Sequence, residues 1–129
     1  MKVLVLSNGK LETKEITNEL EDLQEIVGGY IEIPYLGDTF RNNGIDVIIN
    51  EEGKFIERLK PEIAVVDQVS GRVLDIVYGN CIFASHDEAG ETIELTEEQM
   101  QLVKDELETV IELMNKETLK EFEVRVLFI

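Results

Sequence analysis

Four acidic side chains near the carboxyl end of the chain have the spacing of one helix face. Glu98, Asp105, Glu108 and Glu112 follow one another at intervals of seven, three and four residues, and residues so spaced lie on the same side of an α-helix. At about 1.5 Å of rise per residue, the row would be roughly 20 Å long. A row of carboxylates of that length resembles a stretch of phosphate backbone, so its chemistry would be to bind a basic protein surface.

The energetic cost of this row favours the same interpretation. Like charges at neighbouring helix positions, such as Asp105 with Glu108, destabilise a helix by roughly 0.2–0.5 kcal/mol per pair. A basic partner would offset that cost and would accelerate the encounter by electrostatic steering. A solvated helix face that binds nothing has the same pattern, so both interpretations stay open.

Four arginines and two tyrosines offer a different chemistry. If the guanidinium groups met beside one of the tyrosines, they would form a basic pocket for an anionic ligand. The candidate residues are Tyr30, Arg41, Arg58, Arg72, Tyr78 and Arg125. Further candidates are Tyr30, Glu32 and Tyr35, because they follow Gly28 and Gly29, whose bare backbone would let a ligand approach closely. A helix end and a tight turn also explain these two glycines.

The remaining reactive residue types predict no catalysis. His86 is the only histidine and Cys81 is the only cysteine, whereas a metal or catalytic site needs several ligands or a nucleophile with an activating base. Cys81 lies in an apolar run and is expected to be a small buried side chain. We therefore expect a protein that is not an enzyme and that has no catalytic residue, no metal site and no cofactor.

The charge of the chain limits its partners. Its 129 residues include 28 Asp and Glu against 12 Lys and Arg, a formal net charge of −16. A field of that sign repels nucleic acid and anionic membranes, so we expect neither as a direct partner. The first residues form too short an apolar run for a signal peptide, and a lone cysteine suits a reducing compartment, so a cytoplasmic location is expected.

Local signals predict the elements that position these residues. Asn8 and Gly9 indicate a hairpin turn, and a helix is expected from Asn18, with Glu21 completing its cap, to Gly28. A loop is expected over 37–44. Short apolar segments predict strands, which we expect to form a meander in the middle of the chain. The expected strands are 3–6, 11–16, 30–34, 45–49, 54–59, 63–66, 73–78, 81–84 and 92–95.

The last third of the chain is expected to hold the acidic helix and a final strand. Thr96 and Gln99 form a capping box, and an apolar stripe from Met100 to Met114 predicts a helix of that length. Alternation from Phe122 to Ile129 predicts a strand that is either central in its sheet or covered by a second copy, so a homodimer is a further expectation. The predicted fold is α+β: one domain over 1–129, with a largely antiparallel sheet of about six or seven strands and two helices packed on one face.

Several segments of the chain resemble a known family. The segments are 20–32, which contains LQEIVGGYIE, then 50–54 (NEEGK), 75–80 (DIVYGN) and 95–99 (LTEEQ). Across residues 18–99 the chain is similar to small proteins of bacteriophages and other mobile elements that are catalogued as a domain of unknown function. The resemblance implies an accessory gene and no reaction, and the acidic helix and last strand, 96–129, extend the part that it covers.

Two functions follow as hypotheses. The first is a phage accessory protein that inhibits a host defence factor, as an anti-CRISPR or anti-restriction protein would. Its acidic row would occupy a nucleic-acid channel of that factor. The alternative is a sponge that sequesters a nucleotide immune signal in the arginine pocket.

Overall fold

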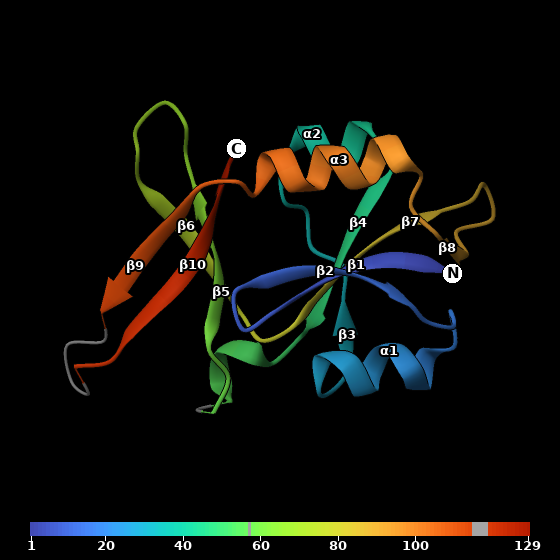
Figure 1. Cartoon of the computed structure of the whole chain (residues 1–129), viewed down its shortest axis with the longest axis horizontal. Helices are drawn as coiled ribbons and strands as arrows, with labels where there is room; N and C mark the ends of the chain where they lie inside the picture. Colours follow the sequence, from blue (N-terminus) through green and yellow to red (C-terminus); the bar gives the residue numbers. More distant parts are fainter. Residues whose placement is uncertain (57, 115–118) are drawn as a thin grey trace.

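The computed structural model describes residues 1–56, 58–114 and 119–129. Within them the chain forms ten strands in two sheets, three α-helices and one 3₁₀ turn (Figure 1). The α+β class is therefore confirmed. In chain order the elements are β1 (Lys2–Ser7), β2 (Lys10–Glu15), α1 (Leu20–Val27), β3 (Ile31–Glu32), α2 (Asp38–Asn42), β4 (Ile45–Asn50), η1 (Gly53–Phe55), β5 (Pro61–Val66), β6 (Val73–Tyr78), β7 (Cys81–His86), β8 (Thr92–Ile93), α3 (Glu97–Glu106), β9 (Val110–Met114) and β10 (Glu121–Phe128).

The first sheet is antiparallel throughout, with the strand order β2-β1-β7-β4-β3 and with β8 paired to β7. Its first hairpin has a two-residue loop, since Ser7 pairs with Lys10. Asn8 and Gly9 have φ of 52° and 79°, which is the left-handed backbone that a tight hairpin turn requires. The hairpin predicted at this dipeptide is confirmed.

The two predicted helices lie on opposite faces of the first sheet, so their expected placement on one face is wrong. Leu23 and Val27 of α1 pack with Val3 and Val5 of β1, whereas α2 and α3 pack on the face that carries Leu4. Successive residues of a strand point to opposite faces, and both faces of β1 are apolar. Figure 1 accordingly shows α2 and α3 above the sheet and α1 below it.

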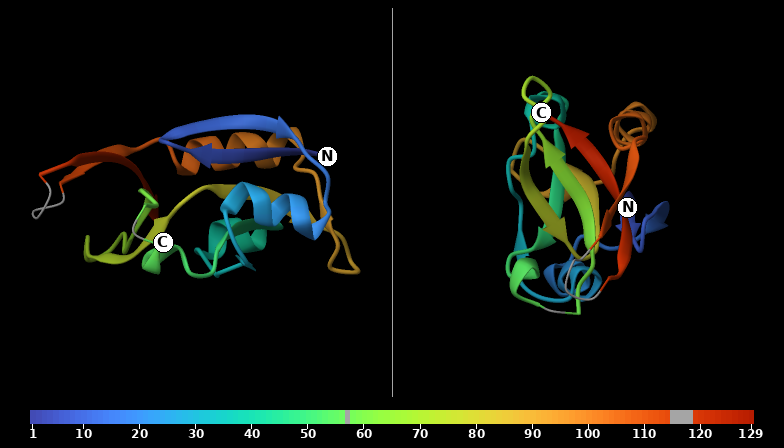
Figure 2. Two further views of the ribbon diagram at one scale, coloured as in Figure 1. Left: turned by 90° about the horizontal axis from the view of Figure 1, so that it is seen from below. Right: turned by 90° about the vertical axis from the view of Figure 1, so that its left-hand side faces the viewer.

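A second sheet, which the sequence did not predict, has the strand order β6-β5-β10-β9. The pair β5 and β10 is parallel and the other two pairs are antiparallel. The expected single sheet with a central meander is therefore wrong. The chain crosses from the second sheet to the first between β6 and β7, at Gly79 and Asn80, and the two sheets lie side by side along the molecule (Figure 2).

The acidic helix is shorter than predicted. It begins with the expected capping box, because Thr96 Oγ1 accepts a hydrogen bond from the Gln99 amide at 3.1 Å and Gln99 Oε1 accepts one from the Thr96 amide at 2.9 Å. It ends at Glu106, and residues 110–114 form β9 instead. Thr109, Val110 and Ile111 are β-branched, which weakens a helix and favours a strand. Pairing with β10 decides the outcome.

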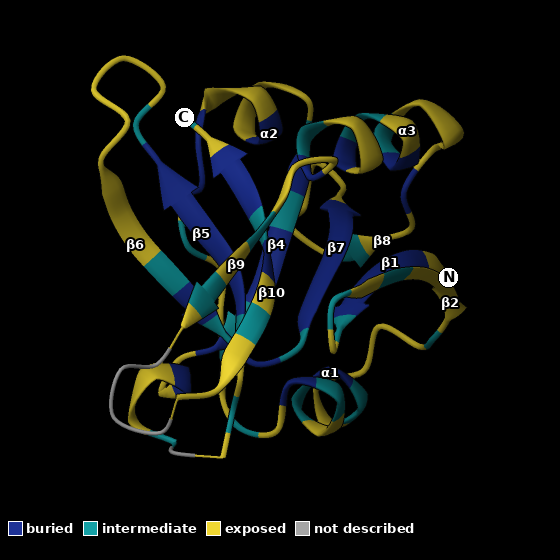
Figure 3. Ribbon diagram, turned by 60° about the vertical axis from the view of Figure 1, so that its left-hand side comes forward, coloured by how far each residue is buried: buried dark blue, intermediate teal, exposed yellow. Residues whose placement is uncertain are grey.

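The final strand β10 is central in its sheet, as one of the two expectations for it stated. It lies between β5 and β9, and its alternate residues face two apolar clusters. Leu127 joins the main core between the sheets, together with Ile63 and Val65 of β5. Val124 and Val126 form a smaller cluster on the other face. Figure 3 shows that β5, which lies beside β10, is buried along almost its whole length.

Three shorter segments also differ from expectation. The first helix begins at Leu20, and its N-cap is Glu19, which makes no side-chain cap. The side chain of Asn18, the expected cap, donates through Nδ2 to the Thr92 carbonyl at 3.3 Å. The predicted loop 37–44 contains the short helix α2. Of the predicted strand 54–59, residues 54 and 55 belong to η1, and residues 56, 58 and 59 lie in no strand, while residue 57 is outside the described residues.

A carboxylate and a guanidinium hold the two sheets together at the Asn8 turn. Glu62 of β5 accepts hydrogen bonds from the backbone amides of Asn8 and Gly9, at 3.1 and 2.8 Å. Arg125 of β10 donates to the carbonyls of Gly9 and Leu107, at 3.0 and 2.9 Å. Glu62 is only 3% exposed, so these bonds are needed to satisfy a buried charge.

Candidate functional site

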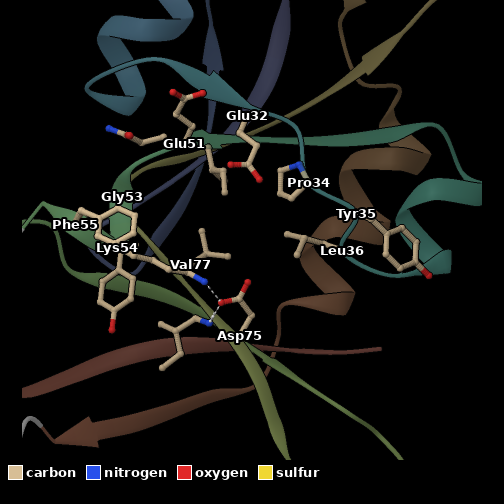
Figure 4. Close-up of a pocket in the computed structure, with 14 residues that line it drawn as sticks. Glu32, Pro34, Tyr35, Leu36, Glu51, Gly53, Lys54, Phe55, Asp75 and Val77 are labelled. Atoms are coloured by element: carbon tan, nitrogen blue, oxygen red, sulfur yellow. Dashed lines mark hydrogen bonds and ion pairs between the residues drawn. The ribbon is translucent and has the colours of Figure 1, made fainter.

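A pocket of about 330 Å³ opens where the two sheets meet. One wall comes from β3, β4 and the segment after β3, and the opposite wall comes from β6, with η1 at one end (Figure 4). We call it the junction pocket. Its lining residues are Glu32, Pro34, Tyr35, Leu36, Ile49, Asn50, Glu51, Gly53, Lys54, Phe55, Asp75, Ile76, Val77 and Tyr78.

Three of the segments that carry the family resemblance meet at this pocket. Segments 20–32, 50–54 and 75–80 together supply nine of the lining residues. The backbone amide of Glu51 donates to the Tyr30 carbonyl at 2.9 Å, and Asn80 Nδ2 donates to the Ile26 carbonyl at 3.0 Å. Segments far apart in the sequence are thus joined by hydrogen bonds around one pocket.

Two glycines allow these segments to approach closely. Gly28 ends α1 in the left-handed conformation with φ of 82°, which confirms its prediction as a helix cap. Gly53 has no such backbone, but a Cβ there would lie 2.7 Å from the Tyr78 carbonyl oxygen. No side chain fits between η1 and β6, so glycine at this position sets the width of the pocket at that end.

The pocket combines apolar walls with acidic groups. Pro34, Leu36, Ile49 and Val77 supply aliphatic surface, and Tyr35, Phe55 and Tyr78 supply aromatic surface. The acidic residues are Glu32, Glu51 and Asp75, against the single cation Lys54. Phe55 is 86% exposed, and an aromatic ring left in water beside a pocket is typical of a surface that binds a partner.

Lys54 lies across the pocket and reaches the opposite wall. Its Nζ is 2.5 Å from Asp75 Oδ1 (Figure 4), and Asp75 Oδ1 also accepts a hydrogen bond from the Ile76 amide at 2.8 Å. The hydrogen bond to Asp75 raises the pKa of Lys54, and the charges of Asp75 and Glu32 raise it further. The side chains of Lys54 and Asp75 are 56% and 46% exposed, so the pair contributes little to stability.

The four residues of the predicted acidic row do not share a helix face, so the row itself is wrong. Glu98 and Asp105 lie on α3, Glu108 follows the end of the helix, and Glu112 lies on β9. All four are exposed. Glu112 stands directly opposite Glu123 of β10, which is an unfavourable arrangement for two like charges.

The candidate arginines lie on separate parts of the molecule. Arg58 precedes β5 and Arg72 follows it, so β5 separates them. Arg41 Cζ lies over the Tyr35 ring, 5.7 Å from the ring centroid. Arg125 donates hydrogen bonds to two backbone carbonyls. None of these four arginines lines the junction pocket.

Among the candidate tyrosines and their neighbours, three residues line the junction pocket and Tyr30 does not. Tyr78 lines the junction pocket, and so do Glu32 and Tyr35. The side chain of Tyr30 is exposed and is not part of the lining. Sequence reasoning missed Lys54, Phe55 and Asp75, although each lies in or beside a segment of the family resemblance, and that resemblance was the signal that could have indicated them.

The two reactive residues considered for catalysis have ordinary surroundings. His86 is exposed, with its Nδ1 at 2.9 Å from Asp46 Oδ2. Cys81 is fully buried, as expected, and burial raises the pKa of its thiol far above the ordinary value, so it stays protonated. Among residues 1–56, 58–114 and 119–129, no three His, Cys, Asp or Glu side chains gather in an arrangement that could hold a metal ion. No helix in this part of the chain is both long and apolar enough to cross a membrane.

The fold and the pocket define an α+β protein in which an acidic, aromatic pocket opens where two sheets meet. The chain belongs to the family described as a domain of unknown function, DUF3846, whose model matches residues 1–108. This match contains the whole junction pocket and leaves β9 and β10 outside. No curated protein and no solved structure matches the chain.

Proposed function

We propose that this protein is a non-enzymatic binding protein that attaches to a basic surface of another protein through the face around the junction pocket. The observation that carries the proposal is the lining of that pocket, where the carboxylates of Glu32 and Asp75 accompany aliphatic and aromatic walls and one lysine (Figure 4). Carboxylates beside apolar surface complement side chains that combine an apolar stem with a positive charge, as lysine and arginine do.

The charge of the whole chain supports this choice of partner. A net charge of −16 creates a negative potential that attracts basic surfaces and raises the rate of encounter with them. The exposed ring of Phe55 beside the pocket supplies the kind of aromatic contact that contributes strongly to protein interfaces. Electrostatic attraction and apolar contact thus favour the same face.

The proposed partner is a host protein that handles nucleic acid. A surface that normally binds nucleic acid is basic, so a nucleic-acid-handling host factor fits the required chemistry. The proposal that the chain is a phage accessory protein and that this factor belongs to host defence rests on the family resemblance alone.

The alternative, a nucleotide sponge, has less support. A nucleotide is anionic and needs several cationic groups, whereas Lys54 is the one lysine or arginine among the lining residues and already faces Asp75. The junction pocket would repel such a ligand through Glu32 and Asp75.

Affinity capture with three matched proteins tests the proposal. The intact chain is compared with a pocket variant, Glu32→Lys plus Asp75→Lys, and with a control, Asp105→Lys plus Glu108→Lys, which changes the net charge equally. Host proteins retained by each are identified, and the dissociation constant of the best is measured at low and high salt. We expect the intact chain and the control to bind one basic protein in a salt-dependent way, and the pocket variant to lose it.

Other results would redirect the proposal. If the control loses the partner and the pocket variant keeps it, then the acidic surface near α3 is the binding site and the pocket is not. If no protein is retained but a nucleotide copurifies with the intact chain, then the sponge hypothesis replaces this one. Circular dichroism of each variant establishes that the fold is intact.

A further inference from the structure

Lys54 provides the junction pocket with a cation from the chain itself. Its ammonium group bonds to Asp75 on the opposite wall, and the carboxylate of Glu32 is close enough to act on it electrostatically. Phe55 and Tyr78 also line the pocket, and Figure 4 shows Lys54 passing beside Phe55. In the structure, therefore, the pocket already contains the ammonium group of Lys54.

The contact between Lys54 and Asp75 can be exchanged at little cost. Both side chains are about half exposed, and exposed ion pairs of this kind are worth little because water solvates each partner after separation. Asp75 Oδ1 also accepts a hydrogen bond from the adjacent Ile76 amide, and this bond does not involve Lys54. An incoming cation at Asp75 would therefore compete with Lys54 for a carboxylate that keeps this second bond.

We propose that Lys54 occupies the place of a partner's arginine side chain, and that the arginine displaces it when the partner binds. This inference rests on the proposed function and names the group that the pocket takes. Arginine suits the site better than lysine, because its planar guanidinium donates to a carboxylate through two parallel bonds and stacks on aromatic rings. The guanidinium would bond to Asp75, with Glu32 nearby and with Phe55 and Tyr78 as stacking surfaces.

Removing Lys54 should strengthen the binding of an arginine peptide, because the internal competitor is gone and the carboxylates remain. If the pocket instead took an anion, Lys54 would be the essential ligand and its removal would abolish binding. Stronger binding in Lys54→Met therefore indicates a cationic ligand, and loss of binding indicates an anionic ligand.

The test uses the intact protein and short peptides followed by NMR titration of the amides of Lys54, Asp75 and Tyr78. The probes are acetyl-Gly-Arg-Gly-amide, the same peptide with neutral citrulline in place of arginine, and AMP. Lys54→Met is compared with Lys14→Met, a matched control because Lys14 is exposed on β2, away from the pocket, and its removal changes the net charge equally. From the strength of exposed ion pairs, we expect Lys54→Met to bind the arginine peptide about twofold to fivefold more tightly than Lys14→Met does.

Two further variants and a control complete the test. Asp75→Asn and Glu32→Gln should each weaken binding of the arginine peptide by at least about threefold. The control Glu12→Gln, an exposed change on β2, should leave binding unaltered. Binding by citrulline equal to that by arginine, a loss of binding in Lys54→Met, or saturable binding of AMP in the pocket would each overturn the inference.

Failure of the inference can be told apart from failure of the proposed function. If the pocket variant Glu32→Lys plus Asp75→Lys loses the captured partner but the arginine peptide does not bind better to Lys54→Met, then the face binds a protein and Lys54 is not its internal substitute. If the pocket variant keeps the partner, the proposed function fails at this site.

Discussion

Gly29 lies against the side-chain amide of Asn50, and no larger residue fits between them. A Cβ built on Gly29 would stand 2.9 Å from Asn50 Nδ2. Asn50 is only 4% exposed, and its amide donates to the Val27 carbonyl at 3.2 Å while its Oδ1 accepts from the Glu52 amide at 2.8 Å. This contact joins the end of α1 to the end of β4 beside the junction pocket.

Gly29→Ala should therefore destabilise the fold without any backbone strain of its own, because Gly29 does not have a positive φ. The added methyl group would push Asn50 from its hydrogen bonds and leave buried polar groups unsatisfied, at a cost of about 1–3 kcal/mol. Urea denaturation measures this cost. In a protein that already carries Asn50→Ala, the same glycine change should cost much less, and equal costs in both backgrounds would disprove the steric explanation.

The buried carboxylate of Glu62 predicts a dependence of stability on pH. Burial raises the pKa of Glu62 above its usual value of 4.5, although the amides of Gly9 and Asn8 act in the opposite direction. The folded state thus holds the proton more tightly than the unfolded state does, so the contribution of Glu62 is greatest below pH 4.5 and is lost as the pH rises through the folded pKa.

Comparison with Glu62→Gln isolates this contribution from the general relief of repulsion on acidification. Glutamine does not titrate, and its misplaced NH₂ group adds a cost that is the same at every pH. The free energy of unfolding, measured in urea at pH 7, 6 and 5, should rise more steeply toward low pH in the natural protein than in the variant. Parallel pH profiles would show that Glu62 does not titrate in this range.

The facing carboxylates of Glu112 and Glu123 predict that a charge reversal stabilises the hairpin of β9 and β10. Either Glu112→Lys or Glu123→Lys replaces a repulsive cross-strand pair with an attractive one, which should add about 0.2–1 kcal/mol to stability. The double variant restores like charges and should lose the gain. Additive effects in the double variant, measured by thermal denaturation, would contradict a direct interaction.

Arg125 is expected to stabilise the protein and not to bind a ligand. Arg125→Met keeps most of the apolar stem but leaves the carbonyls of Gly9 and Leu107 without their donor, at a cost of about 1–3 kcal/mol. Arg125→Lys should recover part of this loss. Arginine-peptide binding at the junction pocket should not change in either variant, and an Arg125→Met protein with natural stability would contradict the structural role.

Features that depend on neighbouring residues could be predicted from the sequence. The turn at Asn8 and Gly9, the cap at Gly28 and the capping box of Thr96 each involve residues within four positions of one another. Their geometry is fixed by local sterics and local hydrogen bonds. The alternation from Phe122 onward also identified β10, because a period of two needs no knowledge of the partner strands.

Features that depend on distant residues could not be predicted in the same way. Val110, Ile111 and Met114 continue the helical stripe of α3, yet Ile111 and Leu113 also alternate as a strand requires. Only the presence of β10 opposite them decides between the two patterns. The division into two sheets has the same origin, since nothing near Cys81 indicates that β7 pairs with β1 and not with β6.

Only some residues of the candidate site could be predicted from the sequence. Tyr78, Glu32 and Tyr35 were among the candidates and do line the pocket. The residues that give the pocket its charge balance, Lys54 and Asp75, are 21 positions apart and pair across the gap between the two sheets. No spacing rule for a single helix or strand connects such residues.

The parallel pairing of β10 with β5 has a consequence for synthesis. During translation Ile63 leaves the ribosome roughly sixty residues ahead of Arg125, its partner in the sheet, which corresponds to seconds of elongation. Over that interval one edge of β5 has no neighbour, and an open strand edge can pair with another chain. A nascent chain stalled before residue 121 should therefore be more prone to aggregate or to recruit a chaperone than one from which β10 has emerged and paired with β5.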